Sequence, residues 1–268
     1  MLPLLVSTPH CSDQVPYWIL AHMLRTGEPE EALRRRILRE GDPHTDALFH
    51  IPEAAVTLNA PASRFVADLN RERDEGGENG VIKLTDFSRR SFYPSGYALS
   101  ARERDLRLAL YYDPYHGALT EAVRGGGIRF LIDGHSMTAR GPAIGPDQGE
   151  PRPALCLGNF GDGQGNPVNG APVSCPPELA RRMRDLADEL LARPIADSGL
   201  EPVALNRPFD GGHILRRYST PPFSIPGLMI EVNRALYLDE DTLLPLPGRV
   251  EKLRKALSRL AALPFASP

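Results

Sequence analysis

Residues 128–136 read IRFLIDGHS, a short apolar run that leads directly to His135. Two other apolar runs lead in the same way to His10 and to Glu231. If the three runs are parallel strands, their carboxyl ends lie at one edge of the sheet, where open α/β folds bind their ligands. Two imidazoles and a carboxylate would then converge on one place, and metal hydrolases use these groups.

The strands of the expected sheet are short apolar runs bounded by polar or turn-forming residues. They are residues 3–8, 55–60, 128–132, 154–158 and 227–232. Segments with a helical spacing of apolar residues lie between and after them, and the clearest are 178–193, just before Pro194, and 249–262. This alternation predicts an α/β fold in which helices cover a mainly parallel sheet.

A further helix is predicted after Ser100, because Ser100 and Glu103 have the spacing of a capping box. The helix should run to Tyr112. Pro114 should then kink or end it, since proline lacks the backbone N–H that a helix interior needs.

Length and composition narrow the classes of function. The 268 residues fit one large α/β domain, residues 1–268, and a net charge of −3 gives no electrostatic reason to expect nucleic acid or an anionic membrane as a partner. The three cysteines are widely spaced and suit a reducing cytoplasm. Neither a signal peptide nor an apolar stretch of about 18 residues is found. We therefore expect a cytoplasmic protein that binds a small molecule.

The candidate metal ligands are His10 and His135, which both follow apolar runs and should lie on loops. A zinc hydrolase also needs a third ligand, often a carboxylate, and an open position for water. Asp13 lies three residues after His10 and could share the metal with it. Asp42 precedes a segment expected to open a helix at the same sheet edge, although it could instead cap that helix. Asp46 lies within that segment, and the choice among the three carboxylates stays open.

Residues 63–71, SRFVADLNR, place two arginines close to Asp68 and Asn70 around an apolar strand. Arginine binds carboxylates through two parallel hydrogen bonds, so Arg64 and Arg71 could hold an acidic substrate or polarise its carbonyl group. The alternative is a plain surface ion pair between Arg64 and Asp68.

Glu231 is the strongest candidate for a general base. It ends an apolar strand, and a partly desolvated glutamate beside a metal-bound water is suited to accept a proton. The alternative is a buried ion pair with Arg217 or Arg234. Arg216 and Arg217 also follow the diglycine at 211–212, where the backbone can approach a ligand closely.

The motifs of the chain, taken together, resemble those of a known family. In order they are PHCSDQVP (9–16), GDPHTDALF (41–49), SRFVADLNR (63–71), PYH (114–116), DGHS (133–136), LGN (157–159), NRPFDGGHILRRY (206–218) and LMIEVNRALYLDE (228–240). This set is similar to that of the N-formylglutamate amidohydrolase family over nearly the whole chain. The resemblance implies a three-layer α/β/α fold around a mixed, mainly parallel sheet, like that of zinc carboxypeptidases and aspartoacylases. It also implies hydrolysis of an N-acyl amide with Zn2+ as the cofactor.

The resemblance also assigns roles to individual residues. The metal ligands of the family correspond to His10, Asp42 and His135, although Asp13 falls where the carboxypeptidase-like relatives have a glutamate ligand. The late catalytic glutamate of the family corresponds to Glu231.

The reaction expected on this basis is the release of formate from N-formyl-L-glutamate. Glu231 would transfer the proton, and Arg71 would stabilise the oxyanion together with zinc. The residues expected around the substrate are Arg64, Asn70, His116, Asn206 and Arg216. One alternative is a deformylase or deacylase of the same fold that acts on a different N-acyl amino acid. Another is a metal-free protein that binds a dicarboxylate.

Overall fold

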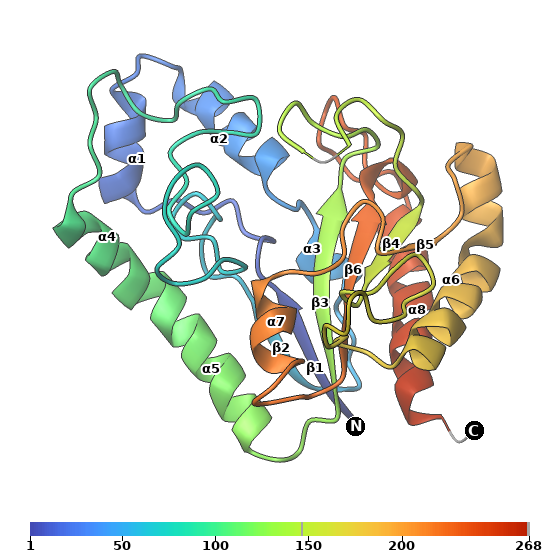
Figure 1. The fold of residues 1–268 in the computed structure, drawn as a ribbon. Helices are drawn as coiled ribbons and strands as arrows, with labels where there is room; N and C mark the ends of the chain where they lie inside the picture. The colour runs from blue at the N-terminus through green and yellow to red at the C-terminus, as the bar shows by residue number, and fades with distance from the viewer. Residues whose placement is uncertain (146, 267–268) are drawn as a thin grey trace.

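The computed structural model describes residues 1–145 and 147–266, whose arrangement is shown in Figure 1. Six strands of this part of the chain form one sheet in the order β2-β1-β3-β6-β4-β5. They are β1 (Leu2–Thr8), β2 (Ala54–Asn59), β3 (Phe130–Met137), β4 (Leu155–Gly158), β5 (Ala204–Leu205) and β6 (Gly227–Asn233). Every neighbouring pair is parallel except β4 and β6. The prediction of a mixed, mainly parallel sheet is therefore confirmed.

Helices cover both faces of the sheet, which gives the expected three layers (Figure 1). One face packs against α6 (Pro177–Ser198) and α8 (Arg249–Ala262), and the other against α5 (Asp113–Arg124) and α7 (His213–Tyr218). The remaining α-helices of the described residues are α1 (Tyr17–Leu24), α2 (Glu30–Glu40), α3 (Thr45–Leu48) and α4 (Ala101–Arg107). Within the described residues, no helix has the length and apolar character needed to cross a membrane.

Strand β1 shows how one strand supplies both cores. Its side chains point alternately to the two faces of the sheet. Leu4 and Val6 belong to the core with α6 and α8, whereas Leu5 belongs to the core with α5 and α7. All three side chains are fully buried. A strand that is covered on both faces therefore needs apolar residues at successive positions.

Strand β3 is longer than predicted. The apolar run suggested an end at residue 132, but the strand continues through Met137 and all eight of its residues are buried. His135 therefore lies inside a strand and not on a loop. The polar residues at 133–136 were misleading because they are buried and paired with one another or with neighbouring elements, which a sequence pattern does not reveal.

Helix α6 passes through Pro194 and ends at Ser198, so the predicted end before Pro194 is wrong. A proline inside a helix costs about 3 kcal/mol, because it removes one hydrogen bond and crowds the preceding turn. Leu191 and Ile195, on either side of Pro194, are buried in the core of the sheet. Burial of such side chains contributes about 1.5–3 kcal/mol each, which offsets the cost of the proline.

The predicted cap at Ser100 is confirmed, since its Oγ accepts a hydrogen bond of 3.1 Å from the backbone N–H of Glu103. After α4 the chain forms a π-helical turn over Leu108–Tyr112 and then continues as α5. Pro114 lies in the first turn of α5. The helix therefore changes to π-type hydrogen bonding just before Pro114, and it continues beyond the proline.

Residues 63–71 form turns and not the expected strand. The segment is anchored at its centre, where the backbone N–H of Asp68 donates to the carbonyl of Val81 at 2.7 Å. Asp68 and Asn70 of this segment contact His10, which follows β1, and His135, which lies in β3.

Gly134 in β3 is packed against the ring of Phe49, which follows α3. A Cβ atom at Gly134 would lie 2.7 Å from carbons of that ring, and Phe49 is buried. We expect Gly134→Ala to lower the free energy of unfolding by about 1–3 kcal/mol, measured by urea denaturation. Gly117→Ala in α5 is the matched control, because a Cβ there meets nothing within 4 Å. It should be neutral or stabilising, and a Gly134→Ala protein as stable as the wild type would contradict the close packing.

Candidate active site

His10, Asp42 and His135 form a buried cluster that could hold a metal ion. His10 follows β1, Asp42 follows α2 and His135 lies in β3. One possible ligand atom from each lies within 4.8 Å of the others. The Oδ2 atom of Asp42 is 3.0 Å from Nδ1 of His135 and 3.5 Å from Nδ1 of His10. The two histidines and one carboxylate are a donor set that zinc accepts.

The opposite nitrogen of each ring is held by a second carboxylate. Nε2 of His10 is 2.8 Å from Oδ1 of Asp68, and Nε2 of His135 is 3.2 Å from Oδ2 of Asp133. Histidines that bind metals usually have such a partner, because it fixes the orientation of the ring and makes the free nitrogen a better donor. The residues present therefore fit a divalent metal ion.

The electrostatics of the cluster favour a positive charge between the rings. Burial lowers the pKa of His135, but Asp133 and Asp42 outweigh burial and hold that pKa well above its ordinary value. Burial raises the pKa of Asp42, but its hydrogen bonds with His10 and His135 bring that pKa far below its ordinary value. The carboxylate of Asp42 is thus ionised, as a metal ligand must be.

Arg234 fixes Asp42 from the other side. Its Nη2 atom lies 3.4 Å from Oδ1 of Asp42 and also donates to the carbonyl of Gly41. Its Nη1 atom donates to the carbonyl of Arg39 at 2.7 Å. The sequence allowed Arg234 to pair with Glu231, but in the structure its carboxylate partner is Asp42.

Arg64 and Asp68 do form an ion pair, but the pair is buried and supports the cluster. Nη2 of Arg64 donates to Oδ2 of Asp68 at 2.8 Å, which leaves the other oxygen for His10. The backbone N–H of Asn70 donates to that same oxygen at 3.0 Å. Asp68 thereby orients His10, and a surface role for the pair is excluded.

Asn70 connects the cluster to α7. Its Nδ2 atom donates to Asp133 at 3.1 Å and lies 3.1 Å from Nε2 of His135. Its Oδ1 atom accepts a hydrogen bond of 2.8 Å from the backbone N–H of Ile214 in α7. A Cβ at Gly212 would lie 2.3 Å from the Asn70 side chain, so the diglycine allows the backbone to approach Asn70 and not a ligand.

Glu231 stands directly beside His135, since the two residues are opposite each other in the parallel ladder of β6 and β3. On its other side it pairs with Cys156 of β4. The side chain is largely buried, and burial raises the pKa of Glu231 to about 7. Among the described residues Glu231 forms no ion pair within 4 Å. Its carboxyl group is thus available and has a pKa suited to exchange protons near neutral pH.

Two carboxylates proposed from the sequence lie outside the cluster. Asp13 accepts a hydrogen bond of 2.8 Å from the side chain of Gln14. Asp46 lies in α3 and lines a separate pocket with His50. The structure therefore brings Asp42, and neither of these, to the two histidines.

The residues expected around the substrate differ in whether their polar groups already have partners inside the protein. His116 is 2.9 Å from the carbonyl of Leu69 through Nε2, and burial lowers its pKa to about 3. Asn206 is hydrogen-bonded to Asn159 and to a backbone carbonyl. Arg216 is exposed and lies over the ring of Phe160. Arg71 has a buried Nε atom that no hydrogen bond satisfies in the described part of the chain.

Lys83, which was not among the predicted site residues, is buried beside Asp68. Its side chain is 3% exposed, and Nζ lies 3.8 Å from Oδ2 of Asp68 without a hydrogen-bond partner among the described residues. Burial, opposed by Asp68 but reinforced by Arg64 and Arg71, lowers the pKa of Lys83 to about 8. The available signal was a lysine inside the apolar stretch VIKL at 81–84.

Lys83 should make stability depend on pH. Its folded pKa of about 8 is below the ordinary value of 10.5, so between these values the unfolded chain binds more protons. The free energy of unfolding should therefore rise with pH in this window, by up to about 3 kcal/mol. Lys83→Met should remove this rise and be more stable than the wild type below pH 8. Urea denaturation of both chelated proteins across the window tests this, and parallel curves would refute it.

The chain is similar to known proteins over most of its length. N-formylglutamate deformylases of Pseudomonas putida and Pseudomonas aeruginosa are each 32% identical to the chain over 250 residues, which is 89% of this chain and 83% of theirs. The crystal structure of an N-formylglutamate amidohydrolase from Ralstonia eutropha JMP134 superposes with a TM-score of 0.70 at 27% identity, covering 98% of this chain and 92% of the other.

The fold, the buried site and these relatives define a hydrolase that acts on an amide. The chain belongs to the N-formylglutamate amidohydrolase family, whose model matches residues 2–238. The resemblance found in the sequence motifs is confirmed.

Proposed function

We propose that the chain is a zinc-dependent deformylase that hydrolyses N-formyl-L-glutamate to formate and glutamate. The observation that carries the proposal is the His10, Asp42 and His135 cluster with the free carboxyl group of Glu231 on the adjacent strand. The activity named for the two Pseudomonas relatives supports the choice of substrate.

His10, Asp42 and His135 would hold the metal ion. Zinc, when bound, supplies a Lewis acid and lowers the pKa of water to about 7. Asp68 and Asp133 keep the imidazole rings of the two histidines in position.

Glu231 moves the proton. With a pKa of about 7 it accepts a proton from the attacking water and later donates it to the leaving amine nitrogen. Water adds to the formyl carbon, the C–N bond breaks, and formic acid and the free amine result; at neutral pH the acid passes its proton to the amine, which gives formate and an ammonium group. The proton that Glu231 takes up is the one it returns, so the carboxylate is regenerated in each cycle.

Arg71 is the residue we assign to the oxyanion, because its buried Nε atom lacks an acceptor in the described structure. Arg216 is exposed and lies over the ring of Phe160, and we assign it to a carboxylate of the substrate. Arg64, Asn70 and His116 have partners inside the protein, so we assign them to positioning the site. Asn206 holds Asn159 at the end of β4, a supporting role.

An amine-release assay tests the function. Purified protein, either zinc-loaded or chelated, is given N-formyl-L-glutamate beside a panel of other N-formyl and N-acyl amino acids. Zinc-dependent release from N-formyl-L-glutamate is the expected result. Release from another panel member alone would keep the chemistry and overturn the substrate. No zinc bound and no release from any compound would favour a metal-free dicarboxylate-binding protein.

A further inference from the structure

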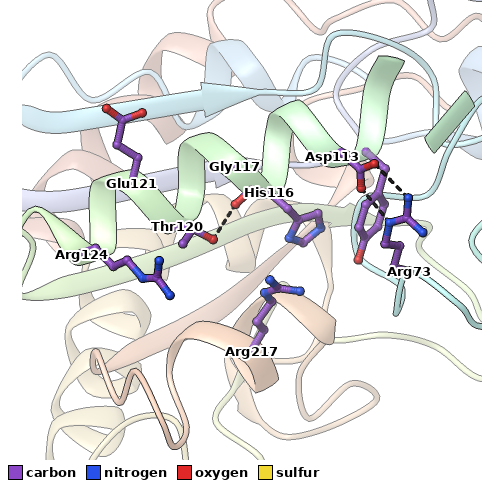
Figure 2. A pocket seen from close by; sticks show the side chains of 9 residues that line it. Arg73, Asp113, His116, Gly117, Thr120, Glu121, Arg124 and Arg217 are labelled. Carbon is purple, nitrogen blue, oxygen red and sulfur yellow. Dashed lines mark hydrogen bonds and ion pairs between the residues drawn. The ribbon is translucent and has the colours of Figure 1, made fainter. Parts of the chain in front are cut away.

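A pocket of about 460 Å³ lies between α5 and α7 (Figure 2). It is lined by nine residues, none of which belongs to the His10, Asp42 and His135 cluster or is Glu231. A cavity of this size is large enough for a small metabolite. The pocket shares His116 with the residues assigned to positioning the active site, but it contains none of the proposed metal ligands and lies apart from Glu231.

Two arginines in the pocket lack a carboxylate partner. Arg73 is already neutralised, because its Nε and Nη2 atoms donate to the two oxygens of Asp113 at 2.8 and 2.9 Å. Arg124 and Arg217 form no ion pair with any described residue within 4 Å. In Figure 2 their guanidinium groups extend into the same space from α5 and α7, whereas Glu121, which also lines the pocket, extends away from these two groups.

Aromatic rings support both of these arginines from one side. The guanidinium of Arg124 lies over the ring of Phe223, and that of Arg217 lies over the ring of Tyr218. The distances from the guanidinium carbons to the ring centroids are 5.8 and 5.5 Å, which is within cation–π range. Such contacts favour a guanidinium group at these positions and leave its N–H groups free to donate to an anion.

Asp113, which pairs with Arg73, and Glu121 are the carboxylates among the described residues that line the pocket, and the other lining residues add no negative charge. His116 is neutral, since burial lowers its pKa to about 3, and its ring nitrogens are used by Leu69 and Tyr218. The hydroxyl of Thr120 donates to the backbone carbonyl of His116 at 2.7 Å. Burial and the nearby Arg217 lower the pKa of His213 to about 4, which reflects the same surplus of positive charge.

We propose that this pocket is a second binding site, which takes a small anion bearing a carboxylate or phosphate group between Arg124 and Arg217. Oxygens of the anion accept hydrogen bonds from the two guanidinium groups. Thr120 lines the pocket between the two arginines. The inference does not depend on the reaction at the metal cluster. Arg217 lies three residues beyond Ile214 in α7, whose N–H holds Asn70, so the bound anion is about one helical turn from the support of the active site.

Calorimetric titration tests the proposal. Inorganic phosphate and L-glutamate are titrated separately into the full-length wild type and into an Arg124→Gln/Arg217→Gln double variant. Binding retained by the double variant belongs to other sites, including the metal cluster. We expect a binding component for at least one of the two anions that weakens about tenfold or more in the double variant. Loss for glutamate alone identifies a carboxylate ligand, and loss for phosphate identifies a phosphate ligand.

The matched control is Arg182→Gln. Arg182 is exposed on α6, on the opposite side of the sheet, and it should bind both probes like the wild type. Circular dichroism and thermal denaturation check that the double variant folds, which is expected because both of its arginines are exposed. If the double variant folds and binds phosphate and glutamate as tightly as the wild type, the proposal is wrong.

Discussion

Asp42→Asn is expected to lose tightly bound zinc and, with it, nearly all hydrolysis of N-formyl-L-glutamate. Asp42 is the carboxylate that both Nδ1 atoms face, and it is ionised despite its burial. An asparagine keeps the shape of the side chain but removes the negative charge. Loss of residues that merely orient metal ligands weakens binding about 10- to 100-fold, so loss of a ligand should exceed that range. Zinc content after dialysis and a competition titration with a chelator measure the effect.

Asp13→Asn is the matched control for this variant. Asp13 follows His10 closely in sequence but contacts Gln14 in the structure. It should keep wild-type zinc affinity and turnover. The reverse outcome, in which Asp13→Asn loses zinc and Asp42→Asn keeps it, would show that the carboxylate ligand is Asp13.

Glu231→Gln should bind zinc normally and turn over substrate about 10²- to 10⁴-fold more slowly. Glutamine has nearly the same size as glutamate but cannot take a proton from water. Because Glu231 makes no ion pair with a described residue, its replacement should not disturb the fold. Steady-state kinetics together with zinc analysis separate the loss of proton transfer from the loss of metal.

Glu240→Gln provides the control for Glu231→Gln. Glu240 follows β6 in the chain, and its side chain accepts a hydrogen bond from the backbone N–H of Ala139 at 2.9 Å, outside the cluster. Its kcat should match that of the wild type. A Glu231→Gln protein with unchanged kcat would remove Glu231 from the mechanism and direct attention to another base.

Much of the sheet could be predicted from the sequence, because strands that are covered on both faces appear in it as short apolar runs. The carboxyl-terminal part of β3 could not. Asp133 and His135 are polar and suggested a loop, yet they are buried through contacts with Asn70 and Asp42, which are distant in sequence. Such pairing is decided by tertiary structure alone.

The choice of metal carboxylate shows the same limit. Asp13 was attractive because it is three residues from His10, but sequence proximity does not determine which way a side chain points. Asp42 reaches the cluster because the chain after α2 hydrogen-bonds to the segment after β1, through the backbone N–H of Asp42 and the carbonyl of His10 at 3.0 Å. The family resemblance matched Asp42 to a family ligand but left Asp13 as an alternative, and the structure brings Asp42 to the two histidines.

The pairing of His135 with Glu231 across β3 and β6 has a consequence for how this enzyme can diversify. The separation of the two residues is set by the spacing of neighbouring strands, which is about 4.8 Å in any sheet, and a change in the surrounding loops does not alter it. If this pair serves hydrolysis as proposed, loops from related enzymes could be grafted around it to change substrate choice without moving the two residues apart. The sheet would thus keep the two residues in place while the loops around them change the specificity.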